Sequence, residues 1–237
     1  MLQNYCAPLC KSIVIMKDYV IIVAGGNGTR MKADLPKQFL DLNGKPVLLH
    51  TIEKFFRFDA HLEIIIVLNA DYVQFWKDLA RTLAISIPHR VVPGGPERFH
   101  SVKNALDTIQ EETGIVGIHD AVRPLVSLKT LESCYAVARE KSNAIPVTHL
   151  NDTLREVHAG KSTTVDRNLF RVVQTPQCFE LSLLKKAYEQ QYHTGFTDDA
   201  SVLEAMGEKI NLVEGNRENI KITTAEDLRM ARALLET

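Results

Sequence analysis

From residue 19 to residue 38 the chain reads YVIIVAGGNGTRMKADLPKQ. Residues 19–23 are a short apolar run rich in β-branched side chains, which predicts a buried strand. The glycines that follow place no Cβ between their backbone N–H groups and a ligand. Successive N–H groups in such a turn form a concave anion site, to which Arg30 and Lys37 add full positive charge. The stretch therefore favours a polyphosphate-binding loop; the alternative is an ordinary tight connection after a strand.

The spacing of the glycines excludes two familiar phosphate loops. A Walker loop needs Gly-Lys-Ser/Thr where its helix starts, and the dinucleotide fingerprint needs a third glycine three residues after the second. Here Gly25, Gly26 and Gly28 lead instead to Arg30 and to a Pro-Lys-Gln motif at residues 36–38. We therefore expect neither an ordinary kinase nor an NAD-dependent dehydrogenase.

The composition is that of a soluble globular protein. Of the 237 residues 45% are hydrophobic and 24% charged, which fits one large domain or a domain with an appendage. The net charge of −1 argues against a broad nucleic-acid surface, and no apolar run approaches the roughly 20 residues that cross a bilayer. The sequence thus predicts no nucleic-acid partner and no membrane anchor.

The first 15 residues are predicted to be a disordered extension, since they lack a signal-peptide pattern and Met16 stands directly before the first strand. The folded domain is expected over residues 16–237. The cysteines are too few and too scattered for a disulfide framework or a zinc site. We therefore expect a reducing, cytoplasmic location. The cysteines are Cys6, Cys10, Cys134 and Cys178.

Strand-like and helix-like segments alternate along the first part of the chain. The strand-like runs are residues 19–23, 62–68, 115–119 and 143–147, and helical spacing of apolar residues covers 47–56, 72–84, 101–110 and 128–139. This alternation predicts an α/β fold with a mostly parallel, twisted sheet and helices on both faces. Because ligands bind at the carboxyl ends of such strands, the glycine loop and the pair His119-Asp120 are expected to share one crevice.

The alternation of strand-like and helix-like segments stops at residues 148–173, which are polar and strand-like with a turn at Gly160. This pattern predicts a protruding β-arm, and a lone hairpin cannot bury both of its faces, so a partner subunit is expected to cover it. Helices are expected again at residues 181–189 and 198–206, a strand at 209–213, and a last helix capped by Thr224.

Two further segments contain candidate ligand-binding residues. In Gly94-Gly95-Pro96-Glu97-Arg98-Phe99-His100-Ser101 the glycines would let a flat base lie against the backbone, and Ser101 offers a hydroxyl to it. The plainer interpretation is a βα loop at a helix start. In the segment 119–124, HDAVRP, Asp120 either forms an internal ion pair with Arg123 or holds a magnesium ion that bridges phosphates.

Arg167 and Lys221 are candidates for phosphate binding. Arg167 lies on the predicted arm, where it is either a solvated charge or reaches into a neighbouring subunit to clamp a phosphate. Lys221 lies in an apolar, strand-like context, where a buried lysine would need an anionic partner such as a substrate phosphate. The eight histidines show no catalytic grouping, and no Gly-x-Ser-x-Gly elbow supports acyl transfer.

The order of these motifs resembles the 2-C-methyl-D-erythritol 4-phosphate cytidylyltransferase family from about residue 18 to the C-terminus. The resemblance implies a nucleotidyltransferase fold related to Rossmann domains and to GT-A glycosyltransferases, and a homodimer joined through the arm. It also implies that CTP and 2-C-methyl-D-erythritol 4-phosphate react to a CDP-alcohol and pyrophosphate, in isoprenoid precursor synthesis. The matching motifs are residues 24–31, 36–38, 94–102, 119–124, 152–153, 165–167, 175–177, 197–201 and 219–221.

The resemblance also implies roles for single residues. The catalytic cations would be Arg30, Lys37 and Lys221. CTP would be bound by Ala24, Gly25, Gly26, Gly28, Gly94, Gly95, Arg98, Ser101 and Ala121. Asp120 would lie near the ribose and hold Mg²⁺, and the methylerythritol phosphate would meet Asp120, Arg123, Thr153, Thr197 and Arg167 of the other subunit.

The chain departs from the family pattern at Gly25, where a second alanine is common, and at Pro96, where an acidic residue is common. Both positions are expected to contribute backbone contacts, so the implied activity stands. The nearest rivals are a D-ribitol-5-phosphate cytidylyltransferase, a sugar-1-phosphate nucleotidylyltransferase and a catalytically silent nucleotide-binding module. The motifs at residues 165–167 and 197–201 favour the methylerythritol enzyme.

Overall fold

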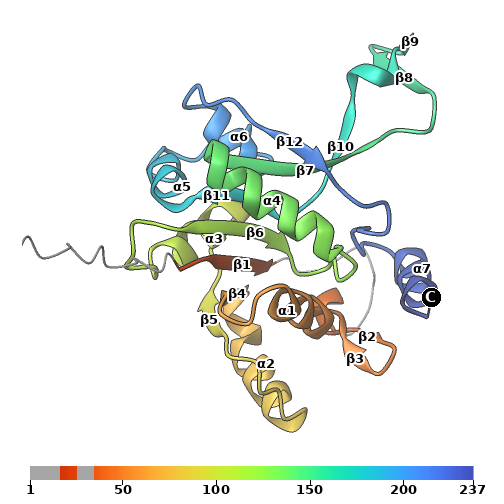
Figure 1. Ribbon diagram of the computed structural model, residues 1–237. Helices are drawn as coiled ribbons and strands as arrows, with labels where there is room; N and C mark the ends of the chain where they lie inside the picture. The colour runs from red at the N-terminus through yellow and green to blue at the C-terminus, as the bar shows by residue number, and fades with distance from the viewer. Residues whose placement is uncertain (1–16, 26–34, 237) are drawn as a thin grey trace, which may run out of the picture.

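The computed structural model describes residues 17–25 and 35–236, in which one eight-stranded sheet organises the chain (Figure 1). The expected extension, residues 1–15, lies outside the described residues. The strand order is β10-β7-β11-β6-β1-β4-β5, and β12 pairs with β7. The strands are β1 (Tyr19–Ala24), β4 (Glu63–Leu68), β5 (Arg90–Pro93), β6 (Ile115–Asp120), β7 (Asn143–His149), β10 (Arg171–Val173), β11 (Gln177–Glu180) and β12 (Leu212–Glu214).

Helices pack on both faces of the sheet, as the alternation of segments predicts. None of the described helices is long and apolar enough to span a bilayer. The helices are α1 (Val47–Phe58), α2 (Ala70–Thr82), α3 (Arg98–Leu106), α4 (Leu128–Lys141), α5 (Leu181–Ala187), α6 (Asp199–Glu204) and α7 (Ala225–Leu235), with short 3-10 turns η2 (Lys37–Phe39) and η3 (Arg167–Leu169).

The central strand β1 explains why its sequence is a continuous apolar run. Its neighbours β4 and β6 both run parallel to it. Val20 and Ile22 face one core with residues of α1, α2 and α4, while Tyr19 and Ile21 face a second core with residues of α3, α5 and α6. A strand buried on both faces needs apolar side chains at every position rather than at alternate ones. The predicted mostly parallel α/β sheet is therefore confirmed.

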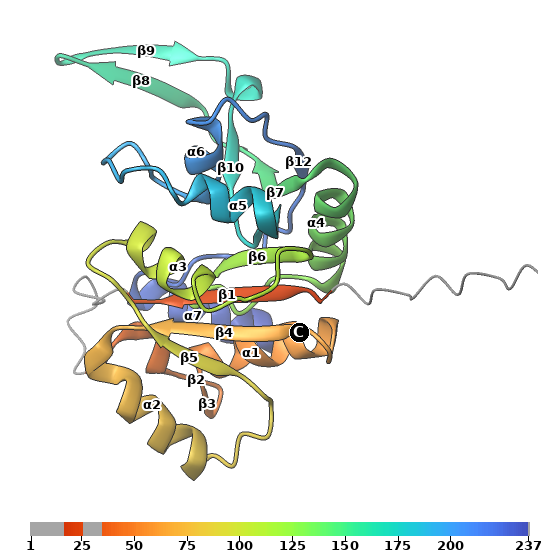
Figure 2. The same cartoon turned by 90° about the vertical axis from the view of Figure 1, so that its left-hand side faces the viewer.

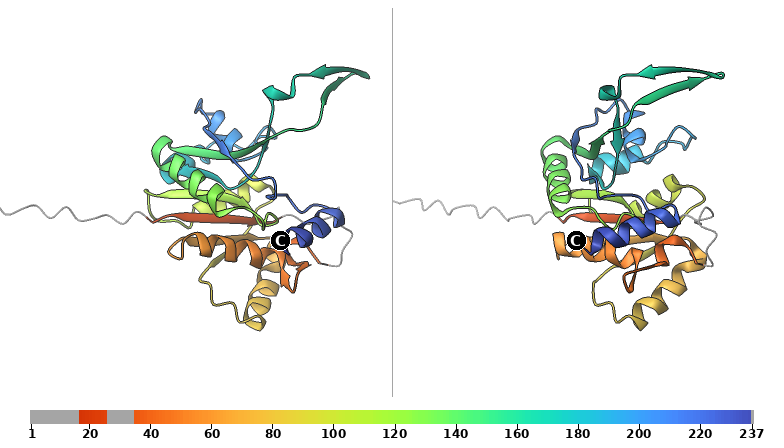
Figure 3. Two further views of the ribbon diagram at one scale, coloured as in Figure 1. Left: turned by 45° about the vertical axis from the view of Figure 1, so that its right-hand side comes forward. Right: turned by 90° about the vertical axis from the view of Figure 1, so that its right-hand side faces the viewer.

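The sheet changes direction beyond β6. There β11 runs antiparallel to both β6 and β7, and β10 runs antiparallel to β7. The sequence prediction missed β5 and β11, which are four-residue strands without a clear apolar alternation. It also missed the small hairpin of β2 (Asp41–Leu42) and β3 (Lys45–Pro46), against which α7 packs (Figure 3).

Several predicted boundaries were wrong by a few residues. The strand predicted at 209–213 begins only at Leu212, and the helix predicted at 101–110 is α3, which begins at Arg98. The strand predicted at 115–119 is β6, which extends by one residue to Asp120, because Asp120 continues its pairing with β1. The strand-like context expected around Lys221 is an extended segment without regular structure, which hydrogen-bonds through the Ile222 N–H to the Val122 carbonyl at 2.9 Å.

The polar segment predicted at 148–173 contains a separate two-stranded sheet, β8 (Leu154–His158) and β9 (Lys161–Val165), which projects from the main sheet (Figure 2). Ala159 and Gly160 join the strands with φ values of +47° and +77°, the pattern of a two-residue hairpin turn. Large apolar side chains remain exposed in this segment, with Val157 at 72% and Leu169 at 80%. The segment leaves the main sheet after His149 and returns at Arg171, opposite it.

Candidate active site

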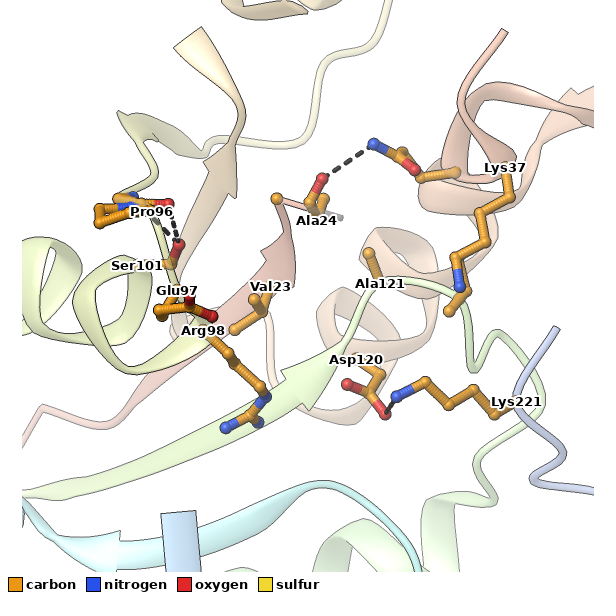
Figure 4. Close-up of a pocket in the computed structure, with 14 residues that line it drawn as sticks. Val23, Ala24, Lys37, Pro96, Glu97, Arg98, Ser101, Asp120, Ala121 and Lys221 are labelled. Carbon is orange, nitrogen blue, oxygen red and sulfur yellow. Dashed lines mark hydrogen bonds and ion pairs between the residues drawn. The ribbon is translucent and has the colours of Figure 1, made fainter. Parts of the chain in front are cut away.

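A cavity of about 340 Å³ opens at the carboxyl ends of β1 and β6, where parallel sheets bind ligands (Figure 4). Of the segments predicted to share one crevice, Ala24 and Gly25 from the described part of the glycine loop line this cavity together with Asp120, whereas His119 does not. Residues from five segments far apart in the sequence surround it. The lining residues are Val23, Ala24, Gly25, Lys37, Gln38, Gly95, Pro96, Glu97, Arg98, Ser101, Asp120, Ala121, Val122 and Lys221.

The end of β1 is fixed by its neighbours. The Ala121 N–H donates to the Val23 carbonyl at 3.0 Å, and the buried Gln38 side chain donates to the Ala24 carbonyl at 2.8 Å. Gln38 belongs to η2, which also places Lys37 on the cavity wall. Of the predicted loop residues, Ala24, Gly25 and Lys37 therefore line the cavity. The predicted ligands Gly26, Gly28 and Arg30 lie outside the described residues.

The second glycine turn forms the opposite wall. The Gly94 N–H donates to the Leu68 carbonyl at 2.7 Å, and the Gly95 N–H donates to Ser101 Oγ at 3.1 Å. A Cβ at Gly94 would lie 2.9 Å from Ser101 Oγ, so the close packing of this turn requires glycine. Gly95 and Ser101 line the main cavity, whereas Gly94 lines a smaller adjoining one together with Gly25.

Arg98 lies on the cavity wall, but its guanidinium is engaged by a buried carboxylate. Nη1 and Nη2 donate to the two oxygens of Asp199 at 2.8 and 2.6 Å. Asp199 is 0% exposed and also accepts a hydrogen bond from the Tyr188 hydroxyl at 2.6 Å. The bidentate pair joins the first residue of α3 to the first residue of α6. Arg98 thus joins the cavity wall to α6, through a partner that the sequence pattern does not reveal.

Asp120 is the centre of charge in the cavity. Its Oδ2 lies 3.0 Å from Lys221 Nζ and 3.2 Å from Arg123 Nε. Burial alone would raise the pKa of Asp120, but the positive charges of Lys221, Arg98 and Arg123 outweigh burial and hold the pKa well below its usual range. The ion-pair interpretation is therefore confirmed, because Asp120 pairs with Arg123. Asp120 also lines the cavity, and its binding of magnesium stays a prediction.

Lys221 reaches the cavity because the Ile222 N–H is hydrogen-bonded to the loop after β6. Its side chain is 44% exposed, and Asp120 supplies an anionic partner for it. Contact of Lys221 with a substrate phosphate stays a prediction. Arg123 is tied down by the Asn219 carbonyl, to which Nη1 donates at 2.7 Å. Thr175 supports Asp120 from behind, since its Oγ1 accepts the Asp120 N–H at 3.1 Å. Gln38 and Thr175 lie within motifs shared with the family, but their supporting contacts could not be expected from the sequence.

The His119 side chain does not line the cavity. Its ring is 0% exposed, with Nε2 3.0 Å from the Arg123 carbonyl and Nδ1 3.0 Å from Thr175 Oγ1. Burial lowers the pKa of His119 to about 4, so the ring is neutral near pH 7. No histidine is among the described residues that line the cavity. The geometry offers cations and a carboxylate, but no histidine base.

One carboxylate fits the donor set of a magnesium site completed by a substrate. Within the described residues, no three His, Cys, Asp or Glu side chains gather to hold a metal ion. Mg²⁺ commonly takes only one or two protein carboxylates beside substrate phosphates. Oδ2 of Asp120 is contacted by two cations, whereas Oδ1 has no hydrogen bond among the described residues, so one oxygen is open to a metal.

Of the predicted substrate residues, Arg123 contacts Asp120 without lining the cavity, and three others also lie outside the lining. Thr153 and Arg167 belong to the projecting segment, and the Arg167 guanidinium donates to the Asn151 carbonyl there. Thr197 is exposed and stands directly before Asp198, whose carboxylate caps α6. None of the three approaches Asp120 closely enough to line this protomer's cavity with it.

Comparison with known proteins agrees with this geometry. A relative from Bacteroides thetaiotaomicron, named 2-C-methyl-D-erythritol 4-phosphate cytidylyltransferase, is 53% identical over 93% of this chain and its own entire length. A relative of the same name from Phocaeicola vulgatus is 51% identical over equal shares. The crystal structure of 4-diphosphocytidyl-2C-methyl-D-erythritol synthase from Anaerococcus prevotii superposes with a TM-score of 0.79 at 28% identity, covering 94% of this chain and 99% of that one.

The family model for these cytidylyltransferases matches residues 19–237, which begin with β1 and include every segment of the cavity wall. The resemblance inferred from the motifs is thus confirmed over nearly the whole chain. This chain belongs to the 2-C-methyl-D-erythritol 4-phosphate cytidylyltransferase family.

Proposed function

We propose that this chain transfers the CMP group of CTP to 2-C-methyl-D-erythritol 4-phosphate, giving 4-diphosphocytidyl-2-C-methyl-D-erythritol and pyrophosphate. Family membership supports the reaction, and the observation that carries it in the structure is the charge arrangement around Asp120. Two cations contact one carboxylate oxygen, and Lys37 lines the same cavity. Such an arrangement suits two phosphate-bearing substrates.

The chemistry requires no general base. A phosphate monoester is already mostly dianionic near pH 7, because its second pKa is about 6. It can attack the α-phosphorus of CTP directly, so the protein must align two mutually repelling anions and neutralise the charge that develops. Lys37 and Lys221 are proposed to do this, together with Arg30. A cavity wall without a histidine is consistent with this mechanism.

The proposed CTP contacts follow the two glycine turns. Ala24, Gly25, Gly95 and Ala121 line the cavity, and their backbone and small side chains are proposed to accept the flat base and the triphosphate. Gly26 and Gly28, which lie outside the described residues, are proposed to bind the CTP triphosphate next to Gly25. Arg98 is proposed to shape the wall, because its terminal nitrogens are held by Asp199.

Asp120 is proposed to hold Mg²⁺ between itself and the CTP phosphates. When bound, the ion would offset negative charge on the phosphates and orient them. Asp120 suits this role because its pKa is held well below its usual range, so it is ionised whenever the enzyme works. Lys221 and Arg123 keep the carboxylate in place from one side.

The projecting segment is proposed to join two copies of the chain. Its exposed apolar side chains, Val157 and Leu169 among them, favour a covered state, and one hairpin is marginal alone. In such a homodimer Arg167 and Thr153 would reach the partner's cavity and bind the methylerythritol phosphate beside Arg123 and Thr197. The enzyme is proposed to act in the cytoplasm, where the free thiols of Cys134 and Cys178 stay reduced.

The reaction is tested by pyrophosphate release from CTP and Mg²⁺. 2-C-methyl-D-erythritol 4-phosphate and D-ribitol 5-phosphate are supplied separately at equal concentration. We expect strong release with the methylerythritol substrate and little with the ribitol substrate. A preference for ribitol phosphate would reassign the acceptor, and silence with both would refute the proposed reaction.

A further inference from the structure

A second cavity of about 250 Å³ lies on the far side of α1 from the glycine turns, between that helix, the β2–β3 hairpin and the last turn of α7. It shares no lining residue with the cavity around Asp120. We call it the α1 pocket. Its lining residues are Asn43, Lys45, His50, Glu53, Lys54, Arg57, Pro124 and Leu235.

The charge of the α1 pocket is not balanced. Positions 50, 53, 54 and 57 are spaced to lie on one face of the helix. Lys45 Nζ pairs with Glu53 at 2.6 Å, which uses the carboxylate in the lining. Lys54 and Arg57 form no hydrogen bond or ion pair within residues 17–25 and 35–236. Two positive charges therefore face this cavity without a counter-charge from the described part of the chain.

The two cations also disfavour each other. Burial lowers the pKa of the half-buried Lys54, and the neighbouring charge of Arg57 lowers it further. A cation in the last turn of a helix is favourable, which accounts for Arg57 alone. The helix dipole does not explain why the partly buried ammonium of Lys54 lies beside the positive charge of Arg57. An anion between them would remove this repulsion.

The rim of the α1 pocket is rigid. Asn43 and Gly44 form the two-residue turn between β2 and β3, with φ values of +50° and +84°. His50 Nε2 lies 2.6 Å from the Leu42 carbonyl, which fastens this hairpin to α1. The turn holds Asn43 and Lys45 opposite the cations of α1, so the site needs little rearrangement to accept a ligand.

We propose that the α1 pocket binds a phosphate-bearing anion through Lys54 and Arg57. The planar guanidinium of arginine matches two phosphate oxygens, and the lysine adds a point charge. The pocket is connected to the cavity around Asp120 through the loop that follows β6. Pro124 lies in this loop after Ala121, and Thr51 of α1 donates to the Ala121 carbonyl at 2.9 Å. The binding proposal is independent of the proposed reaction, because the two cavities have separate walls.

Pulsed lysine acetylation followed by peptide mass spectrometry tests the proposal on the full-length protein. Pyrophosphate and inorganic phosphate are the probes, and sodium chloride at equal ionic strength controls for screening. The readout is the ratio of acetylation rates with and without the probe, lysine by lysine. Lys54 reports the α1 pocket, Lys37 and Lys221 report the reaction cavity, and exposed Lys129 is the internal control.

We expect a phosphate probe to slow acetylation of Lys54 several-fold and saturably, with Lys129 unchanged. Arg57→Gln should abolish this protection, whereas Arg81→Gln, at an exposed arginine of α2, should not. Taking the ratio within each variant removes the change in intrinsic reactivity that loss of Arg57 brings. Protection of Lys37 and Lys221 without Lys54 would overturn the second site while leaving the reaction proposal intact. Equal protection of Lys54 by chloride, or none by any probe, would also overturn it.

Discussion

The ion pair between Arg98 and Asp199 should contribute measurably to stability. Asp199 is fully buried, accepts two hydrogen bonds from Arg98 and one from Tyr188, and begins α6. The substitution Asp199→Asn keeps the shape and an acceptor for Tyr188 but removes the negative charge. Arg98 then loses its only bidentate partner in the described part of the chain.

The expected cost follows from the burial of the two partners. Removing one partner of a buried pair costs about 3–5 kcal/mol, because the other charge is left uncompensated. The Arg98 side chain is 30% exposed toward the cavity and can be partly solvated, so we expect about 3 kcal/mol for Asp199→Asn. For a domain of this size that is a fall in Tm of about 6–12 °C. Arg98→Met should cost more, about 4–5 kcal/mol, because Asp199 has no access to water.

Denaturant and thermal unfolding of the two single variants and the double variant measure the pair. We expect a coupling energy of at least about 2 kcal/mol from the double-mutant cycle. The matched control is Arg81→Met, which breaks the exposed pair with Asp78 and should change stability by less than about 0.5 kcal/mol. A cost for Asp199→Asn no larger than that of the control, with coupling near zero, would refute the reasoning.

Three further predictions concern the site, the arm and the pH dependence. Lys37→Ala should reduce turnover about 100-fold or more without unfolding the protein; a near-normal kcat in steady-state assays would remove Lys37 from the mechanism. If Arg167 acts on the partner's cavity, mixing inactive Arg167→Ala and Lys37→Ala dimers and letting them exchange subunits should restore about a quarter of the wild-type activity. Half of the dimers are then mixed, and each mixed dimer has one intact site out of two. No recovery would show that both residues serve the cavity of one protomer. His119 has a pKa of about 4 in the folded state and about 6.5 in the unfolded state, so the unfolded state binds more protons at low pH. The free energy of unfolding should therefore fall by up to about 3 kcal/mol from pH 7 to pH 4. In unfolding curves measured across this pH range, His119→Gln should make the fall smaller, and an unchanged slope would contradict the lowered pKa.

The long apolar segments were predictable because their own pattern of apolar residues shows which faces are buried. Residues 19–23 need apolar side chains on both faces, and the helical spacing of residues 47–56 matches the buried face of α1. By contrast, β11 is a strand because β6 and β7 lie on either side of it. Its four residues carry no periodic signal, so only the assembled sheet defines it.

For the candidate site too, the sequence predicted the residues of the long motifs but not the partners that hold them. Of the residues predicted to share one crevice, Gly25 and Asp120 do line one cavity, because parallel strands bring their carboxyl ends together. Gly95, which only the resemblance assigned, lines it too. The partners of those residues could not be read from spacing. Arg98 meets Asp199 across 101 positions, and Gln38 supports Ala24 across 14. These contacts depend on how α6 and η2 pack, which the local sequence does not specify.

The way the projecting segment is attached has a consequence for how such proteins diversify. It leaves at His149 and returns at Arg171, and these two residues are paired partners in adjacent strands of the main sheet. The sheet therefore holds both ends at a fixed separation, whatever lies between them. Changes in the length or sequence of residues 150–170 therefore leave Asp120 in place, because the two strands that carry the ends of the segment stay paired. If Arg167 serves the partner's cavity as proposed, every such change must still keep that side chain within reach of the second chain.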